Sequence, residues 1–270
     1  MSEIPSWLPD EDAREPLRRT FDSAADLYDA ARPEYPDRLF DDLVELADLK
    51  PGARLLEIGC ATGKATRPLL ARGFSVVCVE LGAQLAEKAR WNFAGLPLEI
   101  HVEPFETWQG EADAFDLVYA ATAWHWVDPA LRYRKAHELL RPGGHLAFWS
   151  ALHAFPEGFD PFFTEIQEVY DAIGESYGEA WPPAPPEETP DSSAEIEHSG
   201  LFENVRGRRY VWEQSYTADE YIALLDTFSG HISMNASKRE HLYSEIRAKL
   251  GSRRVRRHWY AILHVARRTT

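Results

Sequence analysis

The segment 54–66 constrains the fold of this chain more than any other stretch. A short apolar run, Leu55–Ile58, ends in a turn of small residues, Gly59–Gly63, and a helical pattern follows from Thr66. This order is typical of the first strand, turn and helix of a nucleotide-binding sheet. Glycines let the backbone turn sharply and approach a ligand, and the free N–H groups at the start of the next helix favour an anionic group. The segment therefore predicts a ligand-binding turn at the carboxyl end of a strand.

Short apolar runs then alternate with helical patterns as far as Ser150. We expect strands over 53–58, 74–80, 97–102, 115–120 and 144–150. We expect helices over 64–72, 82–93 and 129–140, and an earlier one that Lys50-Pro51-Gly52 ends. Short continuous apolar strands between helices indicate a parallel sheet covered on both faces. The predicted fold class is therefore α/β, with a doubly wound, mostly parallel, Rossmann-like sheet.

The character of the chain changes after Ser150. Helical patterns cover 159–173, 192–202, 218–228 and 237–250, and a proline-rich run, 181–186, fits neither a helix interior nor a central strand. Two strand patterns cover 206–213 and 258–266. Because these strands lack a βαβ crossover between them, we expect them to form an antiparallel edge on the parallel sheet.

These patterns predict four parts of the chain. They are an N-terminal arm (1–20), a core (21–150), a helical and proline-rich cap insertion (151–204) and a C-terminal part (205–270) whose strands complete the sheet and whose helices, 217–254, extend the cap.

Charge and cysteine content restrict the partners and the compartment. The formal net charge is -15 at pH 7, which opposes broad attraction to nucleic acid or anionic lipid. Cys60 and Cys78 fall in predicted core segments, so we expect reduced, buried thiols. Met1–Pro5 lacks the basic and apolar regions of a secretory signal, and no apolar run approaches ~18 residues. We therefore expect a cytoplasmic protein that binds neither nucleic acid nor membrane.

The spacing of the turn excludes two common nucleotide loops. The dinucleotide fingerprint requires glycine at its sixth position, where this chain has Lys64. The phosphate-binding loop requires four residues between its glycines and a Ser or Thr after the lysine, but three residues separate Gly59 from Gly63, and Ala65 follows the lysine. An acidic residue, Glu80, ends the next strand, where a carboxylate can accept two hydrogen bonds from a ribose diol. We therefore expect an adenosine ribose without a pyrophosphate.

With these features the chain resembles the class I S-adenosylmethionine-dependent methyltransferases, in particular the small-molecule group called methyltransferase type 11, which is related to trans-aconitate methyltransferase. The residues that carry the resemblance are 28–36, 55–63, 79–80, 115–118, 122–127 and 140–144. The resemblance covers 21–150 well, weakens over 151–254 and returns in the last strand. It implies a Rossmann-like fold with a helical cap, and S-adenosyl-L-methionine as the cofactor.

The resemblance also implies how the cofactor is held. Glu57 binds its amino group directly or through water, although the carboxylate could instead only cap loop amides. Glu80 binds the ribose, Tyr28 packs on the cofactor, and Arg32 reaches its carboxylate. The predicted cofactor-binding residues are Tyr28, Arg32, Glu57, Gly59, Ala61, Gly63, Glu80, Leu81, Glu103, Pro104, Phe105, Ala121 and Thr122.

Three details of this set carry separate expectations. Near the adenine, Pro104 has no N–H, so Phe105 has to supply the backbone donor. Ala121 and Thr122 are expected near the sulfonium, at the carboxyl end of a strand. Ala61 stands where the family keeps glycine, and we expect its methyl group to be tolerated only at negative φ.

The acceptor side is predicted from aromatic residues and histidines. Trp124 and Trp126 would form an aromatic wall beside the sulfonium, where cation–π attraction contributes about 0.5–2 kcal/mol. His125 is the candidate general base, and the alternative is a loop histidine that only packs. His153, a second candidate substrate contact, and His231 lie in the variable region.

The sequence therefore predicts methyl transfer from S-adenosylmethionine to a small organic acceptor by in-line displacement, without a metal. The alternatives are a non-catalytic S-adenosylmethionine sensor or scaffold, an RNA methyltransferase, which the net charge disfavours, and a nicotinamide oxidoreductase, which Lys64 disfavours. The arginines at 206, 208, 209, 253, 254, 256, 257, 267 and 268 are expected to be solvated or paired, or else to serve an anionic substrate. Whether oxygen, nitrogen, sulfur or carbon accepts the methyl group, and the oligomeric state, stay open.

Overall fold

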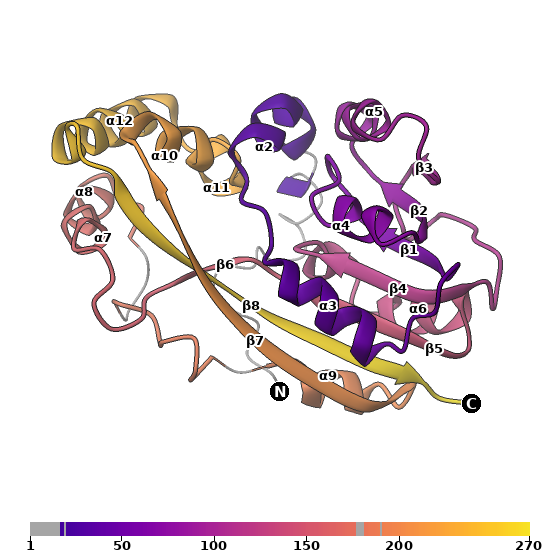
Figure 1. Cartoon of the computed structure of the whole chain (residues 1–270). Coiled ribbons are helices and arrows are strands. Elements are labelled where there is room, and N and C mark those ends of the chain that lie inside the picture. The colour runs from indigo at the N-terminus through magenta and orange to yellow at the C-terminus, as the bar shows by residue number, and fades with distance from the viewer. Residues whose placement is uncertain (1–16, 19, 177–180, 190) are drawn as a thin grey trace.

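A computed structural model describes residues 17–18, 20–176, 181–189 and 191–270 of the chain. Its centre is an eight-stranded sheet in which the strands follow the order β3-β2-β1-β4-β5-β8-β6, and β7 pairs with β8 (Figure 1). The strands of the parallel part are β1 (Arg54–Ile58), β2 (Ser75–Glu80), β3 (Leu98–Val102), β4 (Phe115–Ala121) and β5 (Leu140–Trp149). The predicted α/β class with a mostly parallel sheet is confirmed.

Helices cover both faces of the parallel part. They are α3 (Asp37–Leu46), α4 (Thr66–Ala71), α5 (Ala83–Asn92) and α6 (Arg132–Leu139). Leu39, Phe40 and Leu43 of α3 pack with Leu55 in one buried cluster, while α6 and α9 (Ser193–His198) contribute to the cluster on the opposite face. Because the central strands are buried on both faces, their sequences are continuous apolar runs. Cys60 and Cys78 are free, buried thiols, as expected.

Two long antiparallel strands extend the sheet away from this core. β8 (Val255–Arg268) pairs with β7 (Phe202–Tyr216) on one side, and on the other side with β5 and then with the short β6 (Leu152–Ala154). The antiparallel addition is therefore as predicted, but β8 lies inside the sheet and β7 forms the edge. Figure 1 shows the two strands running from the parallel sheet to a group of helices at their far end.

This group forms the cap. Its helices are α7 (Phe162–Glu165), α8 (Gln167–Ala172), α10 (Ala218–Leu225), α11 (Ser229–Ile232) and α12 (Ala236–Leu250). They share a third apolar cluster with β8, in which Trp259 is fully buried. The helix predicted over 159–173 is divided into α7 and α8, and the one predicted over 192–202 ends at His198 because Gly200 adopts a φ of 68° and β7 begins at Phe202. The division of the chain into four parts stays a prediction.

The N-terminal segment lies over the start of α5. It contains a 3₁₀-helix, η1 (Thr20–Ala24), and α2 (Ala25–Ala31). Of the predicted arm, residues 1–20, the structure describes only Leu17, Arg18 and Thr20. Asp22 accepts a hydrogen bond from the Gln84 backbone N–H at 2.7 Å, and Asp26 pairs with Lys88 at 2.8 Å. Carboxylates at a helix N-terminus are favoured by its free N–H groups. In the part of the chain that the structure describes, no helix is both long and apolar enough to cross a membrane.

Candidate active site

A cavity of about 500 Å³ opens at the carboxyl ends of the parallel strands. It is lined by the residues that follow β1, β2, β3 and β4, by the 3₁₀-helix η2 (Trp124–Trp126), by the N-terminal segment and by the cap residues Phe228–Gly230. Ligands of open α/β sheets bind at this edge, and the volume suits a small organic ligand. Segments from both ends of the chain thus enclose one chamber.

The turn after β1 comes close to the chamber because its backbone is left-handed. Gly59 has a φ of 69°, and a Cβ there would lie 2.8 Å from the Cβ of Ala123. Gly63 has a φ of 94°, and a Cβ there would lie 2.1 Å from the ring of Phe93. Ala61 also adopts a positive φ, of 48°. The expectation that Ala61 requires a negative φ is therefore wrong; the cost of left-handed backbone for a residue with a Cβ, about 1–2 kcal/mol, is tolerated here.

Glu80 explains part of that tolerance. Its Oε2 accepts the backbone N–H of Ala61 at 2.8 Å, and its Oε1 accepts the N–H of Gly82 at 2.8 Å. The left-handed turn aims the Ala61 amide at this carboxylate. Burial raises the pKa of Glu80, and a carboxylate has lone pairs for further donors from the chamber. Glu80 therefore both fixes the turn and presents acceptors at the end of β2.

Glu57 lies beneath the turn and does not line the chamber. It is 1% exposed, and its Oε2 accepts hydrogen bonds from Tyr119 Oη at 2.7 Å and Thr66 Oγ1 at 2.5 Å. Burial raises the pKa of Glu57 to about 7, although both hydrogen bonds act in the opposite direction. The carboxyl group thus titrates near neutral pH from a position directly under the ligand-binding turn.

A second strained residue ends β4. Thr122 has a φ of 56°, and its Oγ1 lies 2.8 Å from Tyr35 Oη and accepts the N–H of Ala151 at 3.1 Å. Its own N–H donates to the carbonyl of Trp149 at 2.7 Å. Left-handed backbone at a non-glycine residue persists where surrounding contacts hold it, and it is often found at functional sites.

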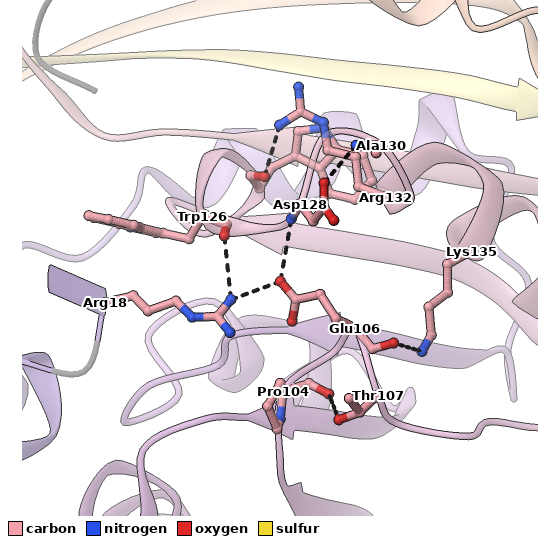
Figure 2. Close-up of polar contacts among 10 residues, drawn as sticks. Arg18, Pro104, Glu106, Thr107, Trp126, Asp128, Ala130, Arg132 and Lys135 are labelled. Carbon is pink, nitrogen blue, oxygen red and sulfur yellow. Dashed lines mark hydrogen bonds and ion pairs between the residues drawn. The ribbon is translucent and has the colours of Figure 1, made fainter. Parts of the chain in front are cut away.

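A polar network tied to Glu106 closes the chamber at the β3 side. Figure 2 shows the Arg18 side chain reaching Glu106 Oε1, at 2.8 Å, and the carbonyl of Trp126, at 3.4 Å. The N–H of Asp128 donates to the same Oε1 at 3.3 Å. The other oxygen, Oε2, is buried and has no hydrogen-bond partner among the described residues, although Glu106 lines the chamber. The network thus leaves one buried acceptor for a ligand donor.

Arg32 lines the chamber from the opposite side. Its Nε and Nη2 donate to Oγ1 and the carbonyl of Thr227 at 2.8 and 2.7 Å. Its guanidinium carbon lies 4.1 Å from the centre of the Phe228 ring and 5.1 Å from that of Tyr28. Burial lowers the pKa of Arg32. The cationic side chain is therefore oriented by the cap.

Most of the predicted site residues meet in this chamber. Those that line it are Tyr28, Arg32, Gly59, Ala61, Glu80, Leu81, Glu103, Pro104, Phe105, Ala121, Thr122, His125 and Trp126. Glu57, Gly63, Trp124 and His153 do not line it. The ring of Trp124 stacks on Phe148 in the core, with 5.2 Å between centroids, so Trp126 alone of the two tryptophans faces the chamber.

The histidines of the variable region are enclosed by the cap. The ring centroid of His153 lies 4.0 Å from that of Phe155, and burial lowers its pKa well below the usual range. His231 Nε2 is 2.9 Å from Tyr170 Oη, and burial lowers its pKa to about 4. Both are neutral at pH 7, and neither lines the chamber.

Three charged or aromatic residues that line the chamber were not predicted from the sequence. Arg18 and Phe21 come from a segment with no motif, and Glu106 follows the predicted adenine contacts by one residue. Phe228 lines the chamber from the cap, where the aromatic residues of the variable region are expected to close over the acceptor. Among the residues described, no three His, Cys, Asp or Glu side chains gather as a metal ion would require.

Known proteins that resemble this chain are described as methyltransferases. The family model described as a methyltransferase domain matches residues 56–148. An uncharacterized methyltransferase of Mycobacterium tuberculosis is 35% identical over 135 residues, which are 50% of this chain and 53% of the relative. The match therefore spans about half the length of this relative.

Solved structures extend the likeness to most of the chain. A proposed type II methyltransferase of Anaeromyxobacter dehalogenans superposes with a TM-score of 0.60 at 20% identity, over 87% of this chain and 97% of that one. Phosphoethanolamine N-methyltransferase 2 of Haemonchus contortus, solved with S-adenosyl-L-methionine, gives a TM-score of 0.55 at 17% identity, over 95% and 60% of the two chains. At these identities the likeness shows the fold. Residues 56–148 of the chain therefore form a methyltransferase domain of the class I S-adenosylmethionine-dependent type.

Proposed function

We propose that this protein transfers a methyl group from S-adenosylmethionine to a small organic molecule. The observation that carries the proposal is the chamber of about 500 Å³ at the end of the sheet, whose wall includes the cap residues Phe228–Gly230 and residues of the N-terminal segment. A cofactor and a small acceptor fit such a volume. An RNA strand needs an open, basic groove, and the net charge of -15 opposes RNA binding.

The residues of the chamber fit the parts of the cofactor. The paired oxygens of Glu80 suit a ribose diol, and the buried, unpartnered Oε2 of Glu106 suits the exocyclic amine of adenine. The Arg32 guanidinium suits the cofactor carboxylate. Glu57 lies under the turn and outside the chamber lining, so its negative charge acts on the cofactor ammonium through water. We therefore add Glu106 to the predicted adenine site beside Phe105.

When bound, the cofactor supplies a methyl group that its sulfonium has already activated. The protein then has to hold the acceptor atom in line with that methyl group and exclude water, and positioning of this kind can contribute about 7–11 kcal/mol. Trp126, held against Phe21 with 5.6 Å between ring centroids, provides an aromatic wall. His125 lines the chamber where it can remove a proton from the acceptor.

Relatives of the fold support a small acceptor. The second Haemonchus contortus structure that superposes on this chain, with a TM-score of 0.54, holds phosphomonomethylethanolamine. That acceptor is a small molecule, and a cap over the sheet is compatible with one here.

Calorimetry and turnover test the proposal. We expect S-adenosylhomocysteine to bind to the wild-type protein, and purified protein given S-adenosylmethionine and a metabolite panel to release S-adenosylhomocysteine. Binding of the cofactor without turnover of any panel member would favour a sensor or scaffold. Retention on RNA at physiological salt, with methyl groups found on the RNA, would overturn the small-molecule assignment.

A further inference from the structure

One buried arginine lacks a counter-charge. Arg257 of β8 is 6% exposed, and in the described part of the chain no carboxylate pairs with it and its Nε has no hydrogen-bond partner. Its guanidinium carbon instead lies over the Trp259 ring at 4.2 Å and faces the Phe228 ring at 5.5 Å. Burial lowers the pKa of Arg257, yet an arginine stays protonated in a protein. The cap therefore encloses a full positive charge.

The groups around Arg257 do not neutralise it at pH 7. The nearest titratable partners are the hydroxyls of Tyr170, Tyr216 and Tyr221, whose pKa values burial raises. His153 and His231 also face this charge, and both are neutral. A buried charge without a partner is strongly unfavourable in a folded protein. Retaining one inside the cap therefore indicates a ligand that supplies the opposite charge.

Further unpartnered nitrogen atoms lie on the same face of the sheet. His153 of β6 and Trp212 of β7 pair in register with Trp259 of β8, one from each side. Directly paired residues share a face, and Arg257, two residues along β8, shares it too. His153 Nε2 and Trp212 Nε1 are both buried without a partner. Three strands thus present polar nitrogens to a region where the described protein atoms offer them no acceptor.

The Phe228 ring separates this region from the chamber. Phe228 lines the chamber, Arg32 lies on its ring at 4.1 Å and Arg257 at 5.5 Å. Arg32 is already assigned to the cofactor carboxylate. Arg257 is the second cation that packs on this ring, and we infer that a ligand in the chamber reaches it by displacing the Phe228 side chain.

We propose that Arg257 binds a carboxylate of the methyl acceptor, with Trp212 Nε1 as a supporting donor. The inference rests on the proposed small-molecule methyl transfer. One guanidinium balances one negative charge, and because the two histidines are neutral, a carboxylate fits better than a phosphate dianion. A carboxylate paired with a guanidinium is a weak nucleophile, since the pair neutralises its charge. The carboxylate therefore serves as a recognition group, and another atom of the same molecule receives the methyl group.

Arg257→Met and Arg256→Met form a matched pair of variants. Both remove one positive charge from the same strand, but Arg256 is exposed and lies 3.8 Å from Glu213. Arg257→Lys keeps the charge and loses the planar fork. Unchanged affinity for S-adenosylhomocysteine in a variant shows that its cofactor-binding site is folded. If Arg257→Met does not fold, Arg257→Lys takes its place in the comparison with Arg256→Met.

The acceptor panel consists of small monocarboxylates, each with its primary amide and the corresponding phosphate monoester. We expect turnover of carboxylates, with kcat/KM about tenfold or more lower for the amides. We expect Arg257→Met to raise KM for a carboxylate about tenfold or more, Arg257→Lys to act in the same direction by less, and Arg256→Met to have no effect. The product should resist mild alkali, because a methylated carboxylate would be an ester and would hydrolyse.

Binding of phenylacetate to protein saturated with S-adenosylhomocysteine, measured by calorimetry, gives a readout that does not depend on turnover. Phenylacetate should bind to the wild-type protein and about tenfold or more weakly to Arg257→Met, and phenylacetamide should bind weakly to both. Equal turnover of acids and amides, an alkali-labile product, or preferred phosphate esters would overturn the inference and leave methyl transfer standing. Absence of any turnover would contradict the proposed function. Failure of phenylacetate to bind, or equal binding to wild type and Arg257→Met, would contradict the carboxylate site at Arg257.

Discussion

Replacement of Glu57 by glutamine tests how the buried charge under the turn affects stability. In the wild-type protein Glu57 Oε2 accepts hydrogen bonds from Tyr119 and Thr66, and burial raises the pKa of the carboxyl group from 4.5 to about 7. Glutamine keeps a carbonyl oxygen for both donors and removes the titration. The variant therefore separates the cost of the charge from the value of the hydrogen bonds.

The sign of the pH effect follows from this raised pKa. Below pH 4.5 Glu57 is protonated in both the folded and the unfolded chain, so its titration adds nothing to stability. Between pH 4.5 and about 7 the unfolded chain loses the proton and the folded chain keeps it, so rising pH favours unfolding. Above about pH 7 the group is ionised in both states and the penalty is constant. Each pKa unit corresponds to 1.36 kcal/mol, so the penalty is about 3 kcal/mol.

Urea unfolding of wild type and Glu57→Gln at both ends of this window provides the measurement. We expect the free energy of unfolding of the variant, relative to wild type, to rise by up to about 3 kcal/mol from pH 4.5 to pH 8. Glu87→Gln, on the exposed side of α5, controls for the loss of one negative charge. A difference between variant and wild type that is the same at both pH values would refute the reasoning. We also expect Glu57→Gln to bind S-adenosylhomocysteine more weakly, since the charge is proposed to hold the cofactor ammonium.

Four further substitutions test the remaining parts of the site. Glu80→Gln should weaken S-adenosylhomocysteine binding about 10- to 100-fold by calorimetry, because charge-assisted hydrogen bonds contribute about 1.5–3 kcal/mol, and unchanged affinity would exclude the ribose role. His125→Gln should lower kcat/KM about 10²- to 10⁴-fold with cofactor affinity intact, and full activity across pH would exclude it as base. Ala61→Gly should raise the free energy of unfolding in urea by up to about 1 kcal/mol, because relief of the left-handed alanine exceeds the added chain entropy of glycine; a clear loss would contradict this. Gly63→Ala should lower the same free energy by about 2–3 kcal/mol through the clash with Phe93, and a neutral effect would show that Phe93 can move.

The parallel core was predictable because its signals are local. Each of the five parallel strands is a short run bounded by a helix, a turn or a loop, and four of them are buried along most of their length. The apolar pattern and the turn residues therefore place them within one or two residues, except for the early start of β5. The three-residue β6 has no such signal, because His153 sits at its centre and its pairing depends on β8. Four helical patterns were predicted after Ser150, but the break between α7 and α8 and the separate short helix α11 were not.

The electrostatics of the site were less predictable, because they depend on residues far apart in the chain. Arg257 and Arg256 are neighbours in the sequence, and alternation on a strand places one on the cap side and the other in solvent. The raised pKa of Glu57 depends on burial under a turn, and it is opposed by the hydrogen bond from Tyr119, sixty-two positions away. The positive φ of Ala61 likewise depends on Glu80, which is two elements further along the chain.

The charges around the chamber have an order that a zwitterionic cofactor and an acidic acceptor would both require. Besides the lining residues Arg18, Glu103 and Glu106, two carboxylates, Glu57 and Glu80, lie on the sheet side, and two guanidiniums, Arg32 and Arg257, lie on the cap side. Of these four groups, Glu80 and Arg32 line the chamber, and Glu57 and Arg257 lie behind its wall. Burial shifts the pKa of each toward the neutral form, so each is held at a cost in the free protein. The proposed cofactor would place its ammonium near Glu57 and Glu80 and its carboxylate near Arg32, and so would compensate these three buried charges. Arg257 would then be the one of the four that keeps an uncompensated charge. The fourth charge is therefore the one that the cofactor leaves for the acceptor.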